Sequence, residues 1–159
     1  MENKQKIFIG WKEWCALPDL NIMYIRAKID TGAKTSSLHA YDIHEFYKRN
    51  QKYVSFNIHP IQNNEKISIP TTAKIIDERY IMSSNGHKEL RYVIATNLIL
   101  GSKKFLIQLT LSNRDPLRYR MLLGRDALTN NFIIDPGKSH CLGRQSNLIV
   151  KKFYLSHHK

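Results

Sequence analysis

Ile25-Arg26-Ala27-Lys28-Ile29-Asp30-Thr31-Gly32-Ala33 is the stretch of sequence that decides the fold of this chain. Its apolar residues alternate with charged ones, which predicts a strand with one buried face that delivers Asp30 into a tight turn. Gly32 lets the backbone approach the carboxylate because it has no Cβ, and the Thr31 hydroxyl can bond to a neighbouring backbone. Asp, Thr and Gly also form ordinary surface turns, so this stretch alone leaves both interpretations open.

The Asp-Thr-Gly turn is present once, although its chemistry normally needs two copies. Two carboxylates held within a few Å cannot both ionise easily, so one keeps a proton and the pair serves as acid and base together. This is the arrangement of aspartic proteolysis. A single copy therefore predicts an active site that exists only in a dimer.

A second segment, Met121-Leu122-Leu123-Gly124-Arg125-Asp126-Ala127-Leu128, reads as an apolar strand, a glycine, a charged pair and a short helix. Together with Ile29-Asp30-Thr31-Gly32-Ala33 it resembles the retropepsin-like aspartic peptidases. In that fold the apolar-apolar-glycine segment lies beside the Asp-Thr-Gly loop. The resemblance implies a one-domain subunit that pairs with itself.

The resemblance extends to a bacterial family labelled ATP-dependent zinc proteases, whose members are similar to retropepsins. Its hallmarks correspond here to residues 26–40, 83–87, 113–115 and 120–125. The family-like core therefore runs from about residue 26 to 136, within a single retropepsin-like domain that we expect to span residues 1–159.

The zinc and ATP parts of that label have no support in the residues. A zinc-protease helix needs a second histidine at the fourth position after the first, but His44-Glu45-Phe46-Tyr47-Lys48 has a lysine there. A phosphate loop needs a leading glycine before its Gly-Lys-Ser ending, but Phe132 stands at that position before residues 137–139. We therefore expect no metal site and no cofactor.

The resemblance assigns roles to residues of both segments. The catalytic residues would be Asp30, Thr31 and Gly32, supported by a loop and the segment beneath it: Ala33, Lys34, Thr35, Ser36, Ser37, Gly124, Arg125 and Asp126. In viral retropepsins an acidic residue commonly follows Asp-Thr-Gly-Ala and pairs with the arginine, whereas this chain has Lys34. The ion pair is then either inverted, from Lys34 to Asp126, or absent with Lys34 in solvent.

A candidate flap lies between residues 79–82 and 90–94. Its Asn-Gly dipeptide is a strong hairpin signal, and the residues that would meet a substrate there are Ser84, Asn85, Gly86 and His87. Gly86 is the only glycine of this turn, whereas retropepsin flaps are rich in glycine.

Strand-like alternation dominates the rest of the chain, for example over residues 53–58 and 105–111. The clearest helical segment runs from Arg125 to Asn130, with Asp126 as its expected N-cap. The sequence thus predicts an all-β protein, a small closed or partly closed β barrel of retropepsin type with one short C-terminal helix.

The chain is strongly basic, with 25 Lys and Arg against 13 Asp and Glu and a formal net charge of +12. Such a field attracts polyanions, either nucleic acid, with Tyr119, Phe153 and Tyr154 able to stack on bases, or an acidic peptide. No nucleic-acid motif is present. The resemblance favours the peptide, because proteins of this family are often encoded beside, or fused to, ATP-grasp ligases that add glutamates to protein tails.

Two cysteines, no apolar leader and no apolar run long enough to span a membrane predict a cytoplasmic protein that does not contact membranes. We expect a homodimeric aspartic endopeptidase that hydrolyses peptide bonds, with acidic, glutamate-rich tails as substrates. The alternative is a non-catalytic binding module for acidic tails, or a partner of an ATP-grasp glutamate ligase.

Overall fold

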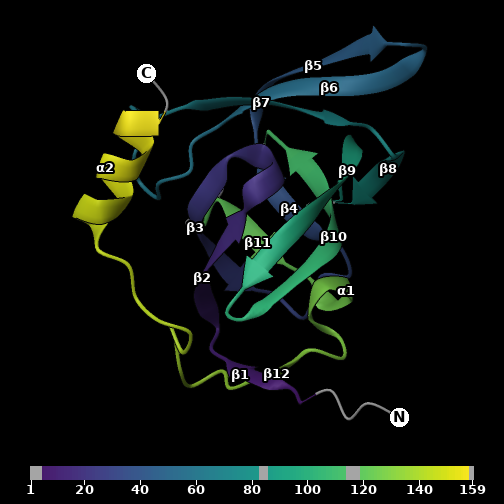
Figure 1. Cartoon of the computed structure of the whole chain (residues 1–159). Coiled ribbons are helices and arrows are strands. Elements are labelled where there is room, and N and C mark those ends of the chain that lie inside the picture. Colours follow the sequence, from purple (N-terminus) through teal and green to yellow (C-terminus); the bar gives the residue numbers. More distant parts are fainter. Residues whose placement is uncertain (1–4, 83–85, 114–118, 158–159) are drawn as a thin grey trace.

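A computed structural model of the chain describes residues 5–82, 86–113 and 119–157. Six strands close into a barrel in the order β10, β4, β11, β3, β2, β9, and the β9–β10 hairpin completes the ring (Figure 1). Their bounds are β2 (Lys12–Leu17), β3 (Ile22–Ile29), β4 (Ser36–His39), β9 (Lys88–Leu100), β10 (Lys103–Ser112) and β11 (Met121–Leu123). A 3₁₀ turn, η1 (Pro18–Leu20), joins β2 to β3. The predicted all-β barrel is confirmed.

The strand that opens the sequence analysis packs as predicted. Ile25 and Ala27 are fully buried and Ile29 is nearly so, while Lys28 between them is exposed. β3 pairs antiparallel with β2 on one side and parallel with β11 on the other. This position in the middle of the sheet fixes the register of β3, because a slip by one residue would bury its charged face.

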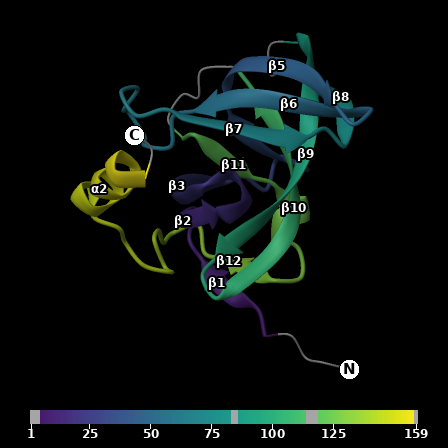
Figure 2. The same cartoon turned by 45° about the horizontal axis from the view of Figure 1, so that its top comes forward.

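Two smaller sheets lie at opposite ends of the barrel (Figures 1 and 2). The segment after β4 forms an antiparallel sheet of β5 (Tyr41–Lys48), β6 (Gln51–Ile58) and β7 (Ile69–Lys74). At the other end, β1 (Ile7–Ile9) pairs in parallel with β12 (Phe132–Ile134). β8 (Asp77–Met82) extends the barrel sheet by pairing with β9.

The helix after Gly124 begins at Arg125, as predicted, but ends at Leu128 rather than at Asn130. It is α1 (Arg125–Leu128), and its N-cap is Gly124, with no side-chain cap. The prediction that Asp126 caps this helix is wrong. The N–H groups of Arg125 and Asp126 instead donate to the carbonyl oxygens of Ala33 and Lys34, at 2.9 and 3.0 Å, so the free amides of the first turn are satisfied by another part of the chain.

A further helix, α2 (Asn147–His157), lies against the outside of the barrel (Figures 1 and 2). Tyr154 is fully buried, and its hydroxyl accepts a hydrogen bond from the Tyr24 N–H at 3.0 Å and donates to the Tyr24 carbonyl. Phe153 packs edge-on against the Tyr24 ring. Neither aromatic side chain is therefore placed as part of a barrel strand, and Tyr154 is not available to stack on a base. Among the described residues, neither helix is long and apolar enough to cross a membrane.

Glu13 is a carboxylate buried in the barrel wall. It is fully inaccessible to solvent, and it accepts backbone hydrogen bonds from Gly10 at 2.7 Å, Cys141 at 2.9 Å and Leu142 at 3.0 Å. A buried charge is tolerated only when its oxygens are hydrogen-bonded. Glu13 therefore fastens the segment that leads to α2 onto the barrel.

We predict that Glu13→Gln lowers the free energy of unfolding by about 2 kcal/mol, because an amide group loses the charge and turns a donor toward backbone N–H groups. Urea unfolding followed by circular dichroism measures the change. The matched control is Glu65→Gln, since Glu65 is exposed. Equal stability of the two variants would contradict this role for Glu13.

Candidate active site

The loop that carries Asp30 follows β3 and leads to β4, and it starts where β3 lies beside β11. The Asp30 N–H donates to the Leu123 carbonyl at 2.9 Å, which continues the parallel pairing of Leu123 with Ile29. Asp30 is thus held by the sheet itself rather than by a free loop. The position of its backbone follows directly from the register of β3 and β11.

The carboxylate of Asp30 closes a tight turn with its own backbone. Its Oδ1 accepts the Gly32 N–H at 3.0 Å, and the Asp30 carbonyl accepts the Ala33 N–H at 3.3 Å. A Cβ at position 32 would lie 3.2 Å from Oδ1, closer than most side chains tolerate, so glycine suits the turn. The Asp30 side chain remains partly accessible and Thr31 is exposed. The Asp30 carboxylate is thus held in a fixed turn at the surface of the barrel.

The segment predicted to support the loop does so through four hydrogen bonds. Besides the two from the start of α1 to Ala33 and Lys34, the Gly124 N–H donates to Ser36 Oγ at 3.0 Å, and Arg125 Nη1 donates to the Thr31 carbonyl at 2.8 Å. The structure therefore brings together residues 30–36 and 124–126, nearly ninety positions apart. We call this set of contacts the loop clamp.

Lys34 and Asp126 do not form the inverted ion pair. Lys34 is exposed, and none of the ion pairs among the described residues joins it to Asp126. The two residues are linked through the backbone, from the Asp126 N–H to the Lys34 carbonyl. The alternative of a solvated Lys34 is the one that the structure shows.

The candidate flap is an antiparallel hairpin of β8 and β9, in which Met82 pairs with Lys88. Of its expected contact residues, Ser84 and Asn85 lie outside the described residues. Gly86 has a left-handed φ of +83°, and His87 is exposed. Arg79 Nη2 in β8 donates to Gln108 Oε1 at 2.8 Å, and Gln108 also lines a small pocket of about 260 Å³ with Thr35 and Asp126. The base of the hairpin is thus connected to the surroundings of the loop clamp.

The described residues also include histidine, acidic and cysteine side chains, among them the buried Cys15. In the described part of the chain, no three His, Cys, Asp or Glu side chains lie close enough to hold a metal ion. Burial, with a smaller effect of the Glu13 charge, raises the pKa of the Cys15 thiol, so this sulfur stays protonated and unreactive.

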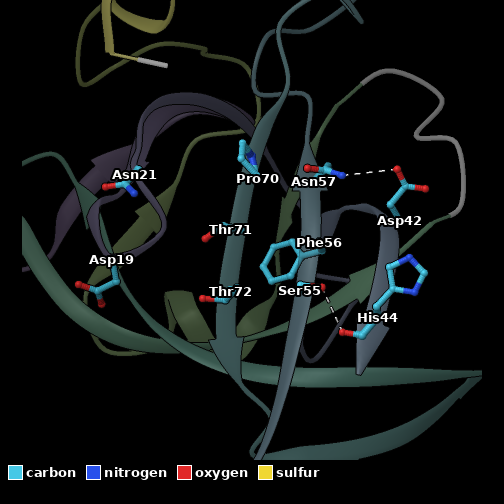
Figure 3. Close-up of a pocket in the computed structure, with 10 residues that line it drawn as sticks. All are labelled: Asp19, Asn21, Asp42, His44, Ser55, Phe56, Asn57, Pro70, Thr71 and Thr72. Atoms are coloured by element: carbon cyan, nitrogen blue, oxygen red, sulfur yellow. Dashed lines mark hydrogen bonds between the residues drawn. The ribbon is translucent and has the colours of Figure 1, made fainter. Parts of the chain in front are cut away.

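Sequence reasoning missed a broad polar groove of about 830 Å³ between the η1 turn and the β5–β6–β7 sheet (Figure 3). Asp19 and Asn21 line it from the barrel, Thr71 and Thr72 from β7, and Asp42 from β5. Hydrogen bonds from the backbone and side chain of Asn97 lower the pKa of Asp19. None of the predicted site residues lines this groove, and no sequence motif marks it, because it forms where the sheet of residues 41–74 meets the barrel.

We predict that Gly124→Ala destabilises the protein by about 2 kcal/mol, as other overpacking substitutions do. The added Cβ would lie 2.8 Å from the Lys34 carbonyl oxygen and 2.9 Å from that of Ala33, both backbone atoms of the loop that carries Asp30. Thermal unfolding measures the effect.

The control is Gly137→Ala, where the nearest atom to an added Cβ lies at an ordinary 3.4 Å. If Gly124→Ala and Gly137→Ala melt at the same temperature, the loop clamp is not the tight contact described above.

Comparison with known proteins identifies relatives over most of the chain. Proteins named probable alpha-L-glutamate ligase are 48% identical over 149 residues in Shewanella pealeana and in Shewanella halifaxensis, and 43% identical over 146 residues in Parasynechococcus marenigrum. The matches cover 94%, 94% and 91% of this chain but 32%, 32% and 31% of those proteins. The chain thus spans about a third of the length of the curated relatives it matches.

A solved structure and a family model agree with the fold. The crystal structure of a Legionella pneumophila protein of unknown function has a TM-score of 0.72 and 29% identity, covering 87% of this chain and 99% of its own. The family model described as retropepsin-like aspartic endopeptidase RimB matches residues 8–145. This match includes the Asp30 turn, the loop clamp and all six barrel strands, and it shows that the chain belongs to the RimB-like family of retropepsin-like aspartic endopeptidases.

Proposed function

We propose that the protein is a homodimeric aspartic endopeptidase whose active site forms from two copies of Asp30. The observation that carries the proposal is the Asp30 turn itself. Its carboxylate is partly accessible, its backbone is fixed by Leu123, and Thr31 beside it is exposed. One subunit supplies one carboxylate of this kind, and the chemistry of the family requires two.

Each part of the turn has a role in the proposed dimer. The exposed Thr31 hydroxyl bonds to the backbone of the partner's turn and holds the two loops in register. The loop clamp keeps each carboxylate in a fixed position, because Arg125 donates a hydrogen bond to the Thr31 carbonyl and the Gly124 N–H donates one to Ser36 Oγ. Preorganisation of this kind matters because a small displacement of reacting groups lowers the rate strongly.

The proposed reaction is hydrolysis by a water molecule bound between the two carboxylates. The ionised Asp30 takes a proton from the water while the water oxygen attacks the carbon of the peptide carbonyl. The protonated Asp30 of the other subunit polarises that carbonyl. A tetrahedral intermediate forms, and its C–N bond breaks as the nitrogen receives a proton. The products are a carboxylic acid and an amine, and no covalent enzyme intermediate is formed.

The charge of the chain supports acidic peptides as substrates. A net charge of +12 creates a field that concentrates anionic ligands. The relatives named probable alpha-L-glutamate ligase contain a matching region as about a third of their length, which supports a link between this domain and glutamate-containing tails. The same observation favours a second candidate function, a module that binds such tails, or a ligase, without cutting.

We predict that Asp30→Asn lowers peptidase turnover at least about a hundredfold, because an amide can neither accept nor pass the proton. Fold and dimer should persist, since the Asn carbonyl oxygen can still accept the Gly32 N–H. Product formation is followed by mass spectrometry and the oligomeric state by analytical ultracentrifugation, with Asp42→Asn as the control at an exposed aspartate. Wild-type turnover in purified Asp30→Asn would overturn the aspartic mechanism.

The requirement for two copies is tested by co-expressing wild-type and Asp30→Asn chains in known proportions. If two Asp30 carboxylates form one site, activity falls with the square of the wild-type fraction, because mixed dimers are inactive. Activity that falls in simple proportion would show that each subunit acts alone.

We further predict that a glutamate-rich peptide is cut faster than its glutamine counterpart, and that the difference shrinks as salt rises. Screening shortens the reach of exposed charges to about 10 Å at 0.1 M ionic strength. Cleavage of both peptides is compared across roughly pH 4 to 8 at two salt concentrations. Tight binding without cleavage throughout would favour the binding module.

A further inference from the structure

Two lysines stand beside Asp30 on the outer face of the barrel. In β3 the buried residues Ala27 and Ile29 alternate with Arg26 and Lys28, which face outward. Asp30 continues this alternation, because its N–H still follows the β3–β11 pairing. Side chains two residues apart in a strand lie on the same face at about 7 Å spacing, so Lys28 and Asp30 emerge side by side.

The second lysine lies directly across from the first. Lys12 of β2 pairs in register with Lys28, and the Trp11 carbonyl accepts the Ile29 N–H at 2.8 Å. Facing residues of antiparallel strands have Cβ atoms about 5 Å apart. The Lys12 Nζ lies over the Trp11 ring, 4.7 Å from its centroid. Both lysines are thereby fixed to the backbone that positions Asp30.

In the described part of the chain, no ion pair neutralises this pair of like charges. Facing like charges destabilise a sheet, yet none of the ion pairs among the described residues includes Lys12 or Lys28. Glu13, the acidic residue next to Lys12, is buried and bonded to backbone amides. The adjacent outward pair is Trp14 and Arg26, in which the guanidinium lies over the indole, 4.9 Å from the ring centroid. The outward residues of β2 and β3 that lead to Asp30 are thus two lysines, an arginine and a tryptophan, and Leu122 of β11 lies on the other side of Lys28.

We infer that Lys28 and Lys12 form a carboxylate-binding subsite that selects an acidic substrate side chain next to the scissile bond. This inference rests on the proposed peptidase function and adds the residues that determine specificity. A substrate bound in extended form across Asp30 places neighbouring side chains about 7 Å apart on each face, which matches the spacing of Asp30 and Lys28. Two ammonium groups at one position bind a carboxylate through charge-assisted hydrogen bonds, and the substrate charge then relieves the repulsion between them.

If the two lysines were an ordinary solvated pair, we would expect a different result. General attraction of an acidic peptide to a basic surface depends on net charge and is lost equally when any exposed lysine is neutralised. A subsite depends on two particular lysines and on the position of the acidic residue in the peptide. The matched control is Lys48, an exposed lysine in the β5–β6–β7 sheet, because Lys48→Gln changes the net charge by the same amount.

The experiment compares kcat/KM for two peptides that differ only by glutamate or glutamine beside the cleaved bond. We expect Lys28→Gln and Lys12→Gln each to reduce the preference for glutamate about tenfold, whereas Lys48→Gln keeps the wild-type preference. Lys28→Glu should reverse the preference toward a peptide with lysine at that position. An unchanged preference in both Lys28→Gln and Lys12→Gln, or an equal loss in Lys48→Gln, would overturn the subsite.

A binding measurement separates failure of the subsite from failure of the proposed function. The same peptides are titrated into Asp30→Asn protein, alone and combined with Lys28→Gln or Lys48→Gln, and followed by fluorescence anisotropy. If the wild-type protein cuts neither peptide but Lys28→Gln selectively weakens binding of the glutamate peptide, the subsite stands and the peptidase proposal falls. If all these proteins bind both peptides alike, the subsite is wrong whatever the catalytic result.

Discussion

The loop clamp is the contact on which the candidate active site depends. A turn that presents a carboxylate has little structure of its own, and here residues 30–36 receive backbone and side-chain hydrogen bonds from Gly124, Arg125 and Asp126. The same bonds satisfy the first amides of α1, so one set of contacts both starts a helix and holds the loop that carries Asp30. Close approach without a side chain makes this possible, since a Cβ at Gly124 would collide with the backbone of Lys34 and Thr35.

Much of the barrel and its site could be predicted from local patterns. The alternation at Ile25, Ala27 and Ile29 predicted a half-buried strand, because a strand pattern reports directly which face is buried. The resemblance to retropepsins, rather than a local pattern, implied that the segment from Leu122 to Gly124 lies beside it, and both expectations are confirmed. The expected cap at Asp126 failed for the opposite reason. The first-turn amides of α1 donate to carbonyl oxygens about ninety residues earlier in the chain. No local sequence pattern can show that acceptors from such a distant segment satisfy these amides.

Other features depend on distant contacts in the same way. Glu13 is a charged residue that no pattern in the sequence marks as buried, yet it is fully inaccessible and bound by the amides of residues 10, 141 and 142. The polar groove exists because the sheet of residues 41–74 folds back over η1. The helix α2 was not predicted, although Val150, Phe153 and Tyr154 have the spacing of one helix face. No spacing in the sequence could reveal that the Tyr154 hydroxyl bonds to the backbone of Tyr24.

The contact between Tyr154 and Tyr24 also protects the barrel against association with other chains. β11 pairs with β3 over Ala27 to Ile29, and the β2–β3 register shifts between Cys15 and Leu17, so the Tyr24 backbone falls beside a gap in the ladder. An unpaired strand segment of this kind is a template for strand addition and aggregation. The Tyr154 hydroxyl bonds to both the N–H and the carbonyl of Tyr24, as the backbone of a neighbouring strand would. α2 thus covers this part of β3, and without the helix the Tyr24 N–H and carbonyl would be open to pairing with another strand.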